Sequence, residues 1–141
     1  MHQLRDALPR RADPARLSGS DGRASAEAFF AGRPVGLAVL VRVRTLLDAT
    51  GAYEVRTTRS QVAFRRARGF AYLWDPGRYL PRATAEVVLT VALGRHEPSP
   101  RFKEVVHPSP RHWMHHLEIR DATEIDDEVA GWLREAWERA E

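Results

Sequence analysis

The sequence contains no cysteine. This absence excludes disulfide bonds, a thiolate nucleophile, iron–sulfur ligation and the usual cysteine-based zinc sites. The sequence also lacks any run of about 18 apolar residues, and its N-terminus lacks the apolar segment of a secretory signal. We therefore expect a cytoplasmic protein with no membrane partner.

Lysine is almost absent, because Lys103 is the only lysine among the 22 basic residues. Arginine therefore supplies nearly all of the positive charge behind the net charge of +3. The planar guanidinium group matches phosphate and carboxylate groups, so the excess is compatible with an anionic partner. Codon bias in a genome rich in G and C produces the same composition and is the simpler explanation.

The chain of 141 residues has the length of one ordinary domain. Its first 24 residues carry five arginines among prolines and glycines, without sustained hydrophobic periodicity. Such a segment buries too little apolar surface to offset the entropy lost on ordering. We predict a disordered Arg-rich arm over residues 1–24 and a single domain over residues 25–141.

Two helices are predicted directly after the arm. Ser25 is a suitable N-cap for a short first helix that ends at Gly32. Pro34 suits the first position of a second helix, in which apolar residues recur with the helical period until Gly51.

The C-terminal segment predicts a third helix. Its apolar residues form one stripe between Ile125 and Ala140, and acidic residues lie on the opposite side. Asp121 and Glu124 precede the stripe as a pair that resembles a capping box. We expect this amphipathic helix to lie on a sheet.

Between these helices the hydrophobic period changes to two, which is typical of strands. The pattern predicts five strands, at residues 53–58, 61–65, 70–74, 86–93 and 113–119. Short links between the first three favour an antiparallel meander. Residues 94–111 contain the tetrapeptide Pro-Ser-Pro-Arg twice and are predicted to form a loop, with at most one helical turn. The elements together predict an α+β two-layer sandwich with a five-stranded, mostly antiparallel sheet.

Several short segments occur in the order found in a bacterial domain family. They are FFAGRP at 29–34, SQVAFR at 60–65, GFA at 69–71, PRFKEV at 100–105 and HHLE at 115–118. Over about residues 26–140 the chain resembles this family, which is catalogued as a domain of unknown function. Its members occur alone or as a terminal module of larger proteins, some of them labelled predicted transport proteins. The resemblance implies an α+β domain and supplies no activity.

The residues that could form catalytic or metal-binding motifs match no standard pattern. On a strand, His112, His116 and Glu118 share one face, but their spacing matches no standard metal motif, so we predict no metal. Ser60 and Ser99 lack the turn that accompanies a nucleophilic serine. No phosphate-binding loop or dinucleotide fingerprint is present, and no cofactor is predicted.

The arginines near the first three strands lie among aromatic residues, a combination that can bind nucleic acid. Strand parity assigns Phe70, Tyr72 and Trp74 to one face, which we expect to form the core beneath the helices. The opposite face then carries a polar set that converges if its strands are neighbours. This set consists of Arg56, Gln61, Arg65, Thr90, His116 and Glu118.

The favoured hypothesis is a binding or interaction module rather than an enzyme, with an anionic small molecule or nucleic acid as partner. Its predicted ligand-binding residues are Arg56, Gln61, Arg65, His116 and Glu118. One alternative is a small enzyme that uses His116 and Glu118 as an acid/base pair. Another is a protein-interaction domain that uses the outer face of the last helix and Trp137.

Overall fold

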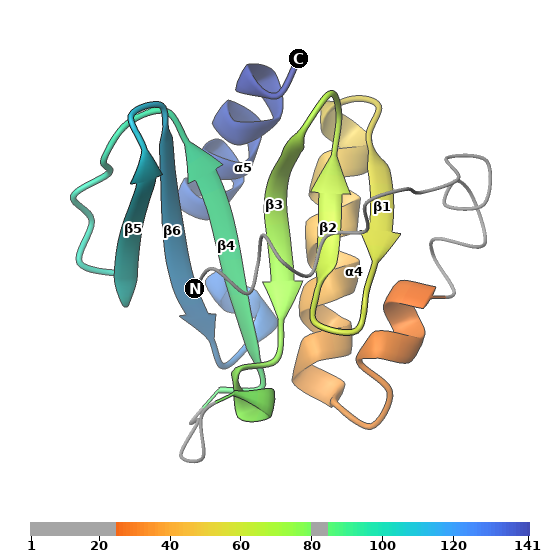
Figure 1. Ribbon diagram of the computed structural model, residues 1–141. Coiled ribbons are helices and arrows are strands. Elements are labelled where there is room, and N and C mark those ends of the chain that lie inside the picture. The colour runs from red at the N-terminus through yellow and green to blue at the C-terminus, as the bar shows by residue number, and fades with distance from the viewer. Residues whose placement is uncertain (1–24, 80–84) are drawn as a thin grey trace.

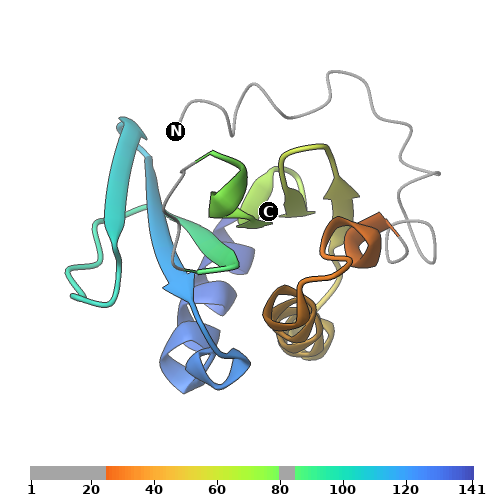
Figure 2. The ribbon, with the colours of Figure 1, turned by 90° about the horizontal axis from the view of Figure 1, so that it is seen from below.

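A computed structural model describes residues 25–79 and 85–141. The predicted N-terminal arm lies outside these ranges. The described chain forms a single antiparallel sheet of six strands in the order β1-β2-β3-β4-β6-β5. Helices α4 and α5 lie on the same face of this sheet (Figures 1 and 2). The α+β class is thus confirmed, and the described residues include no helix long and apolar enough to cross a membrane.

The end of the first N-terminal helix and both ends of the second follow the local signals in the sequence, while Ser25, the predicted N-cap, is already helical. A short helical stretch spans residues 25–29, and Gly32 then adopts a left-handed φ of 77° that residues with a side chain rarely adopt. Helix α4 spans Pro34–Thr50, with proline in its first turn. It ends where the Gly51 N–H donates to the Leu47 carbonyl oxygen at 3.0 Å.

Helix α5 spans Asp127–Arg139 and starts later than its predicted cap. The Asp126 carboxylate caps it by accepting from the Val129 N–H at 3.2 Å. Asp121 instead caps the short 3₁₀ helix η2, Ala122–Glu124. The prediction of one cap was wrong because the sequence offers two capping aspartates in succession, and the buried Ile125 separates the two turns.

The strands are β1 (Glu54–Thr57), β2 (Val62–Arg65), β3 (Gly69–Trp74), β4 (Val87–Leu93), β5 (Glu104–Ser109) and β6 (His112–Ile119), and the 3₁₀ helix η1 (Pro76–Arg78) follows β3. Strand β5 lies in the segment that was predicted to be a loop. Among the described strands it pairs only with β6, and the register shifts between Val106 and Ser109. Proline lacks an N–H donor, but an edge strand with an irregular register tolerates it, so the strand forms despite Pro108.

The face of the sheet beneath α4 and α5 carries the main apolar core. Its fully buried side chains include Val62, Phe64, Leu73, Leu89 and Val91. Tyr72 and Trp74 do not belong to this core, contrary to the prediction, and form a smaller cluster on the opposite face with Ala63 and Val88. Strand β3 is apolar at every position after Gly69, so parity alone could not decide which of its faces meets the helices.

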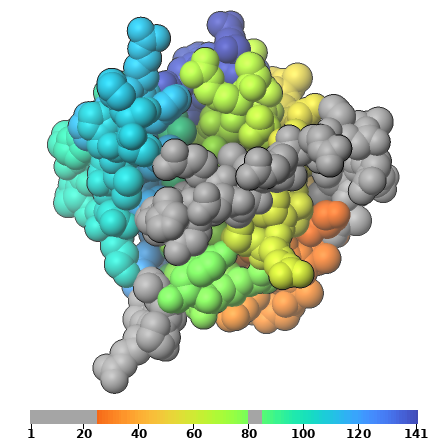
Figure 3. All heavy atoms as spheres, viewed as in Figure 1, coloured from red at the N-terminus to blue at the C-terminus, as the bar shows by residue number. Residues whose placement is uncertain are grey.

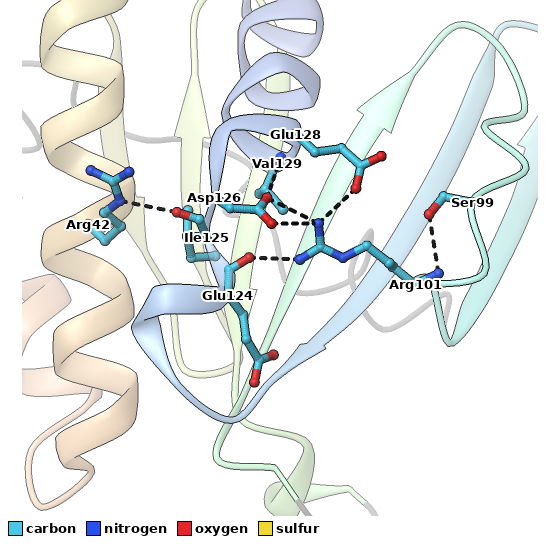
Figure 4. A network of polar contacts seen from close by, with 8 residues as sticks. All are labelled: Arg42, Ser99, Arg101, Glu124, Ile125, Asp126, Glu128 and Val129. Atoms are coloured by element: carbon cyan, nitrogen blue, oxygen red, sulfur yellow. Dashed lines mark hydrogen bonds and ion pairs between the residues drawn. The ribbon is translucent and has the colours of Figure 1, made fainter.

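The segment before β5 is fastened to the start of α5 by Arg101 (Figure 4). Its guanidinium lies 2.8 Å from the Glu128 carboxylate and 3.1 Å from that of Asp126, and it also donates to the Glu124 carbonyl oxygen at 2.8 Å. Arg42 of α4 donates to the Ile125 carbonyl oxygen at 3.2 Å. These contacts connect both helices to the polypeptide around η2.

Candidate functional site

The face that carries neither α4 nor α5, the helix-free face, contains most of the predicted site. Pairing across all six strands aligns Arg56, Ala63, Tyr72, Thr90, His116 and Glu104 in one row. Arg56 and His116 are four strand separations apart in this row, or about 19 Å. The predicted residues therefore share a face but do not converge on one small ligand. Arg56, Gln61 and Arg65 lie at its β1–β2 end, while His116 and Glu118 lie on β6.

Arg56 and Arg65 are diagonal neighbours, because Arg56 pairs with Ala63 and Arg65 pairs with Glu54. Among the described residues, neither guanidinium has a carboxylate oxygen within 4.0 Å. Burial lowers the pKa of Arg56, and the positive charge of Arg65 lowers it further, against the opposing effect of Glu54. The Arg56 Nε atom is buried and has no hydrogen-bond partner in the described structure.

Tyr72 brings a third donor to this end of the face. It pairs with Ala63, which in turn pairs with Arg56, so the three residues adjoin on neighbouring strands. Burial raises the pKa of Tyr72 although Arg65 acts to lower it, so the phenol stays protonated at neutral pH. A Cβ atom on Gly69 would lie 2.2 Å from the Tyr72 hydroxyl oxygen. Glycine at position 69 thus leaves the space that the hydroxyl occupies.

Gln61 supports the turn that leads into β2. Its side chain is fully buried, and its backbone carbonyl oxygen accepts from the Thr58 N–H at 2.9 Å. Ser60 and Thr58 complete the turn through a contact of 3.3 Å between their hydroxyl oxygens. Gln61 therefore lies at the arginine end of the face, in the segment that sets the spacing of β1 and β2.

His116 belongs to a buried hydrogen-bond chain with Trp74 and Thr90. Trp74 Nε1 donates to Thr90 Oγ1 at 2.9 Å, and that oxygen lies 2.6 Å from His116 Nδ1. The Thr90 hydroxyl has one hydrogen, and if it donates this hydrogen to Nδ1, the proton of the neutral imidazole ring lies on Nε2. This arrangement leaves fewer buried groups unpaired than the tautomer that carries its proton on Nδ1. Burial lowers the pKa of His116 to about 4, so the ring is neutral at pH 7.

Glu118 faces cations rather than His116. Its carboxylate oxygens lie 2.7 Å from Lys103 Nζ and 3.1 Å from Arg120 Nη2. The hydrogen bond from Lys103 is the main cause that lowers the Glu118 pKa. The described residues contain no group of three His, Asp or Glu side chains placed to hold a metal ion.

His115 and Trp137 also have structural contacts. His115 Nε2 accepts from the Glu97 N–H at 2.9 Å, and its Nδ1 lies 3.0 Å from the Trp113 carbonyl oxygen. The Trp137 indole donates to the Ala52 carbonyl oxygen at 2.9 Å. The Arg66 guanidinium lies 3.8 Å from the centre of the Trp137 ring, so one face of this half-buried tryptophan is covered.

The comparisons with known proteins agree with the resemblance found in the sequence. Residues 26–140 match the model of the family described as Domain of unknown function (DUF5655). The chain belongs to this family. The family match includes all the described strands together with α4 and α5, and every residue of the candidate site. Neither a curated protein nor a solved structure matches the chain.

Sequence reasoning missed Tyr72 and Gly69 as parts of the site. Tyr72 was assigned to the core because strand parity placed it with Phe70. Only the pairing of β3 with β2 shows that Tyr72 follows Ala63 and Arg56 onto the helix-free face. No local signal distinguishes such a tyrosine from one in the core, because both stand in an apolar strand.

Proposed function

We propose that this domain is a binding module for an anionic ligand, which Arg56, Arg65 and the Tyr72 hydroxyl hold on the helix-free face. The observation that carries the proposal is the pair of neighbouring guanidiniums that share no carboxylate among the described residues. An anion between them would replace charge repulsion with charge-assisted hydrogen bonds. Phosphate and carboxylate groups both fit the planar donor geometry of arginine.

Several arginines in the described part of the chain are paired with carboxylates. Arg33 lies 3.0 Å from the Asp75 carboxylate, Arg95 binds Glu135 through two bonds of 2.9 Å, and Arg101 joins the acidic start of α5. Those arginines have a carboxylate partner and a structural role. Arg56 and Arg65 have no carboxylate partner in the described part of the chain although they are neighbours and Arg56 Nε is buried, which supports a role for them in binding.

The geometry favours binding over acid/base catalysis by His116 and Glu118. A general acid or base works best when its pKa lies near the working pH, and the pKa of His116 is about 4. Its Nδ1 atom faces Thr90, while Glu118 forms ion pairs with Lys103 and Arg120. A histidine oriented by a threonine and held neutral suits a fixed hydrogen-bonding role.

Calorimetric titration of the full chain with inorganic phosphate tests the proposal. Replacing both Arg56 and Arg65 with alanine should weaken binding by at least about tenfold, because each charge-assisted hydrogen bond contributes about 1.5–3 kcal/mol. Tyr72→Phe removes only the hydroxyl and should weaken binding several-fold, by about 1 kcal/mol. Arg134→Ala is the matched control, because Arg134 is an exposed residue of α5.

Thermal unfolding of each variant checks that the fold is retained. Folded double-mutant protein that binds phosphate as tightly as wild type contradicts the proposal, as does equal weakening by Arg134→Ala. Acetate as a second titrant separates phosphate recognition from general carboxylate binding. A site for phosphate should prefer it over acetate, because phosphate offers more acceptor oxygens to three donors.

A further inference from the structure

A second basic cluster lies at the end of the sheet where the β2–β3 turn meets the C-terminus of α5. It consists of Arg68 in that turn, Arg111 and His112 where β6 begins, and Arg139 at the end of α5. The Ala67 N–H donates to the Ala140 carbonyl oxygen at 3.0 Å, which joins the turn to the helix. Figures 1 and 3 show these segments side by side at the top of the molecule, with the β5–β6 turn beside them.

The position of the Arg139 side chain is fixed by its contacts. Arg139 Nη2 donates to the Arg111 carbonyl oxygen at 2.6 Å, which spans from α5 to the β5–β6 turn. A Cβ atom on Gly94 would lie 3.0 Å from Arg139 Nε, so the guanidinium rests closely against this glycine. Arg139 is therefore held in place while its charge stays without a carboxylate partner in the described structure.

The charges of the cluster act on one another. Burial lowers the pKa of Arg139, and Arg68 lowers it further, while Glu135 acts in the opposite direction. Glu135 itself is engaged by Arg95. Burial lowers the pKa of His112, and the positive charges of Arg139 and Arg68 lower it further. Within the described residues, no carboxylate oxygen lies within 4.0 Å of the Arg68, Arg111 or Arg139 guanidiniums.

The second cluster continues the candidate site. Arg65 pairs with Gly69 next to the turn of the β2–β3 hairpin, and Arg68, in that turn, immediately precedes this glycine. Arg68 thus follows Arg65 by one short turn, and its charge acts on Arg139. We name the resulting series the basic band, and it consists of Arg56, Arg65, Arg68, Arg139 and Arg111.

We propose that the ligand of this domain is a single-stranded nucleic acid whose successive phosphates lie along the basic band. The proposal rests on the proposed function, because the Arg56/Arg65 pair is assigned one of these phosphates. One small anion reaches only one end of the band, whereas a chain of phosphates engages both ends through Arg68. Each contact releases counterions, so the affinity gains with every phosphate that is neutralised.

A single strand fits this surface better than a duplex. A flexible backbone can follow the band from the helix-free face round the β2–β3 turn to α5 on the other face, whereas a duplex is stiff over so short a length (Figures 1 and 2). Reading a duplex groove requires an element that projects into it, such as a helix or a two-stranded ribbon. The β2–β3 turn is instead bonded back to α5 through Ala67 and Ala140, and Arg66 is stacked on Trp137. The basic band therefore contacts a backbone laid across it rather than the edges of paired bases.

Fluorescence anisotropy of the full chain with labelled oligothymidylates of about 4, 8 and 16 nucleotides tests the inference. Affinity should rise with length, and the logarithm of the association constant should fall with the logarithm of salt concentration by about 0.7 per phosphate contacted. Arg68→Ala should make this slope shallower by about 0.7. The same variant should bind inorganic phosphate as wild type does, because Arg68 lies outside the Arg56/Arg65 pair.

Two further variants keep the test sharp. Arg139→Gln should reduce the salt slope by a similar amount, about 0.7, whereas Arg139→Lys keeps the charge and should retain the slope. Arg134→Ala changes the net charge equally but lies on α5 away from the basic band, so it should leave the slope unchanged. Circular dichroism confirms that each variant is folded before it is compared.

The outcomes separate the two proposals. If Arg68→Ala leaves oligonucleotide affinity and salt slope unchanged, or if affinity does not rise with length, the nucleic-acid inference is overturned while phosphate binding at Arg56 and Arg65 stands. If phosphate binding survives loss of that pair, the proposed function itself falls. A duplex bound as tightly as a single strand of equal length overturns the assignment to single strands.

Discussion

The two faces of the sheet differ in what their buried residues do. All seven residues of β4 are buried, and they alternate between the faces. Leu89 and Val91 pack beneath the helices in an apolar core, whereas Thr90 joins Trp74 and His116 in a hydrogen-bond chain on the helix-free face. The helix-covered face thus provides apolar stabilisation, and the helix-free face holds polar groups in fixed positions on the same surface as the Arg56/Arg65 pair.

The largest expected effect tests the apolar side of this comparison. Leu89→Ala should reduce the free energy of unfolding by about 3–4 kcal/mol, because it removes buried methyl groups and leaves a cavity in the main core. Val88→Ala on the opposite face should cost about 1.5 kcal/mol. Urea denaturation of both variants measures the difference. Equal costs would show that the two faces contribute alike to stability.

The pH dependence of stability tests the polar side. The pKa of His116 is about 4 in the folded protein, below its ordinary value in an unfolded chain, so the unfolded state binds the additional proton first as pH falls. Stability is therefore full above about pH 6.5 and should fall by roughly 3 kcal/mol as pH decreases to 4. His116→Gln should remove this part of the decline. If the free energy of unfolding falls with pH in the same way in wild type and His116→Gln, His116 is not the cause of the decline.

Thr90→Val and Val91→Thr, at neighbouring positions of β4, should each reduce the free energy of unfolding by about 2 kcal/mol. The first removes a hydroxyl from a polar site, and the second adds one to an apolar site. Thr90→Val leaves Trp74 Nε1 and His116 Nδ1 without their partner, while Thr90→Ser keeps the hydroxyl and serves as control. Val91→Thr places a hydroxyl in the apolar core. Chemical denaturation measures both changes. A neutral Thr90→Val substitution would show that the chain of hydrogen bonds contributes nothing to stability.

Alanine substitutions at two glycines should have the smallest effects on stability. Gly69→Ala forces the Tyr72 hydroxyl to move, which should cost about 1 kcal/mol and weaken phosphate binding. A Cβ atom on Gly131 in α5 would have no neighbouring atom within 4 Å, so Gly131→Ala should stabilise the protein by up to about 1 kcal/mol. Melting temperatures and phosphate titrations of both variants test this contrast. If Gly69→Ala binds phosphate as tightly as wild type, Tyr72 does not contribute to the binding site.

Local signals predicted the elements that depend on neighbouring residues. The start of α4 follows from Pro34, and its end follows from Gly51, because both residues act on their own turn of backbone. The family resemblance was also readable from short segments and was confirmed. Strand β5 was missed because the proline content of its segment opposes a regular strand, and only pairing with β6 stabilises it.

The α+β class, the helices, most strands and the polar residues of the helix-free face could be predicted from the sequence, since these depend on periodicity and on local backbone preferences, whereas Tyr72 and Trp74 of that face could not. The strand order, which separates Arg56 from His116 and brings Tyr72 to the arginines, could be read only from the folded chain. The folded chain also shows that Glu118 faces Lys103 and Arg120. The physical reason is that register and strand order depend on contacts between distant segments, and a pattern within one segment does not encode them.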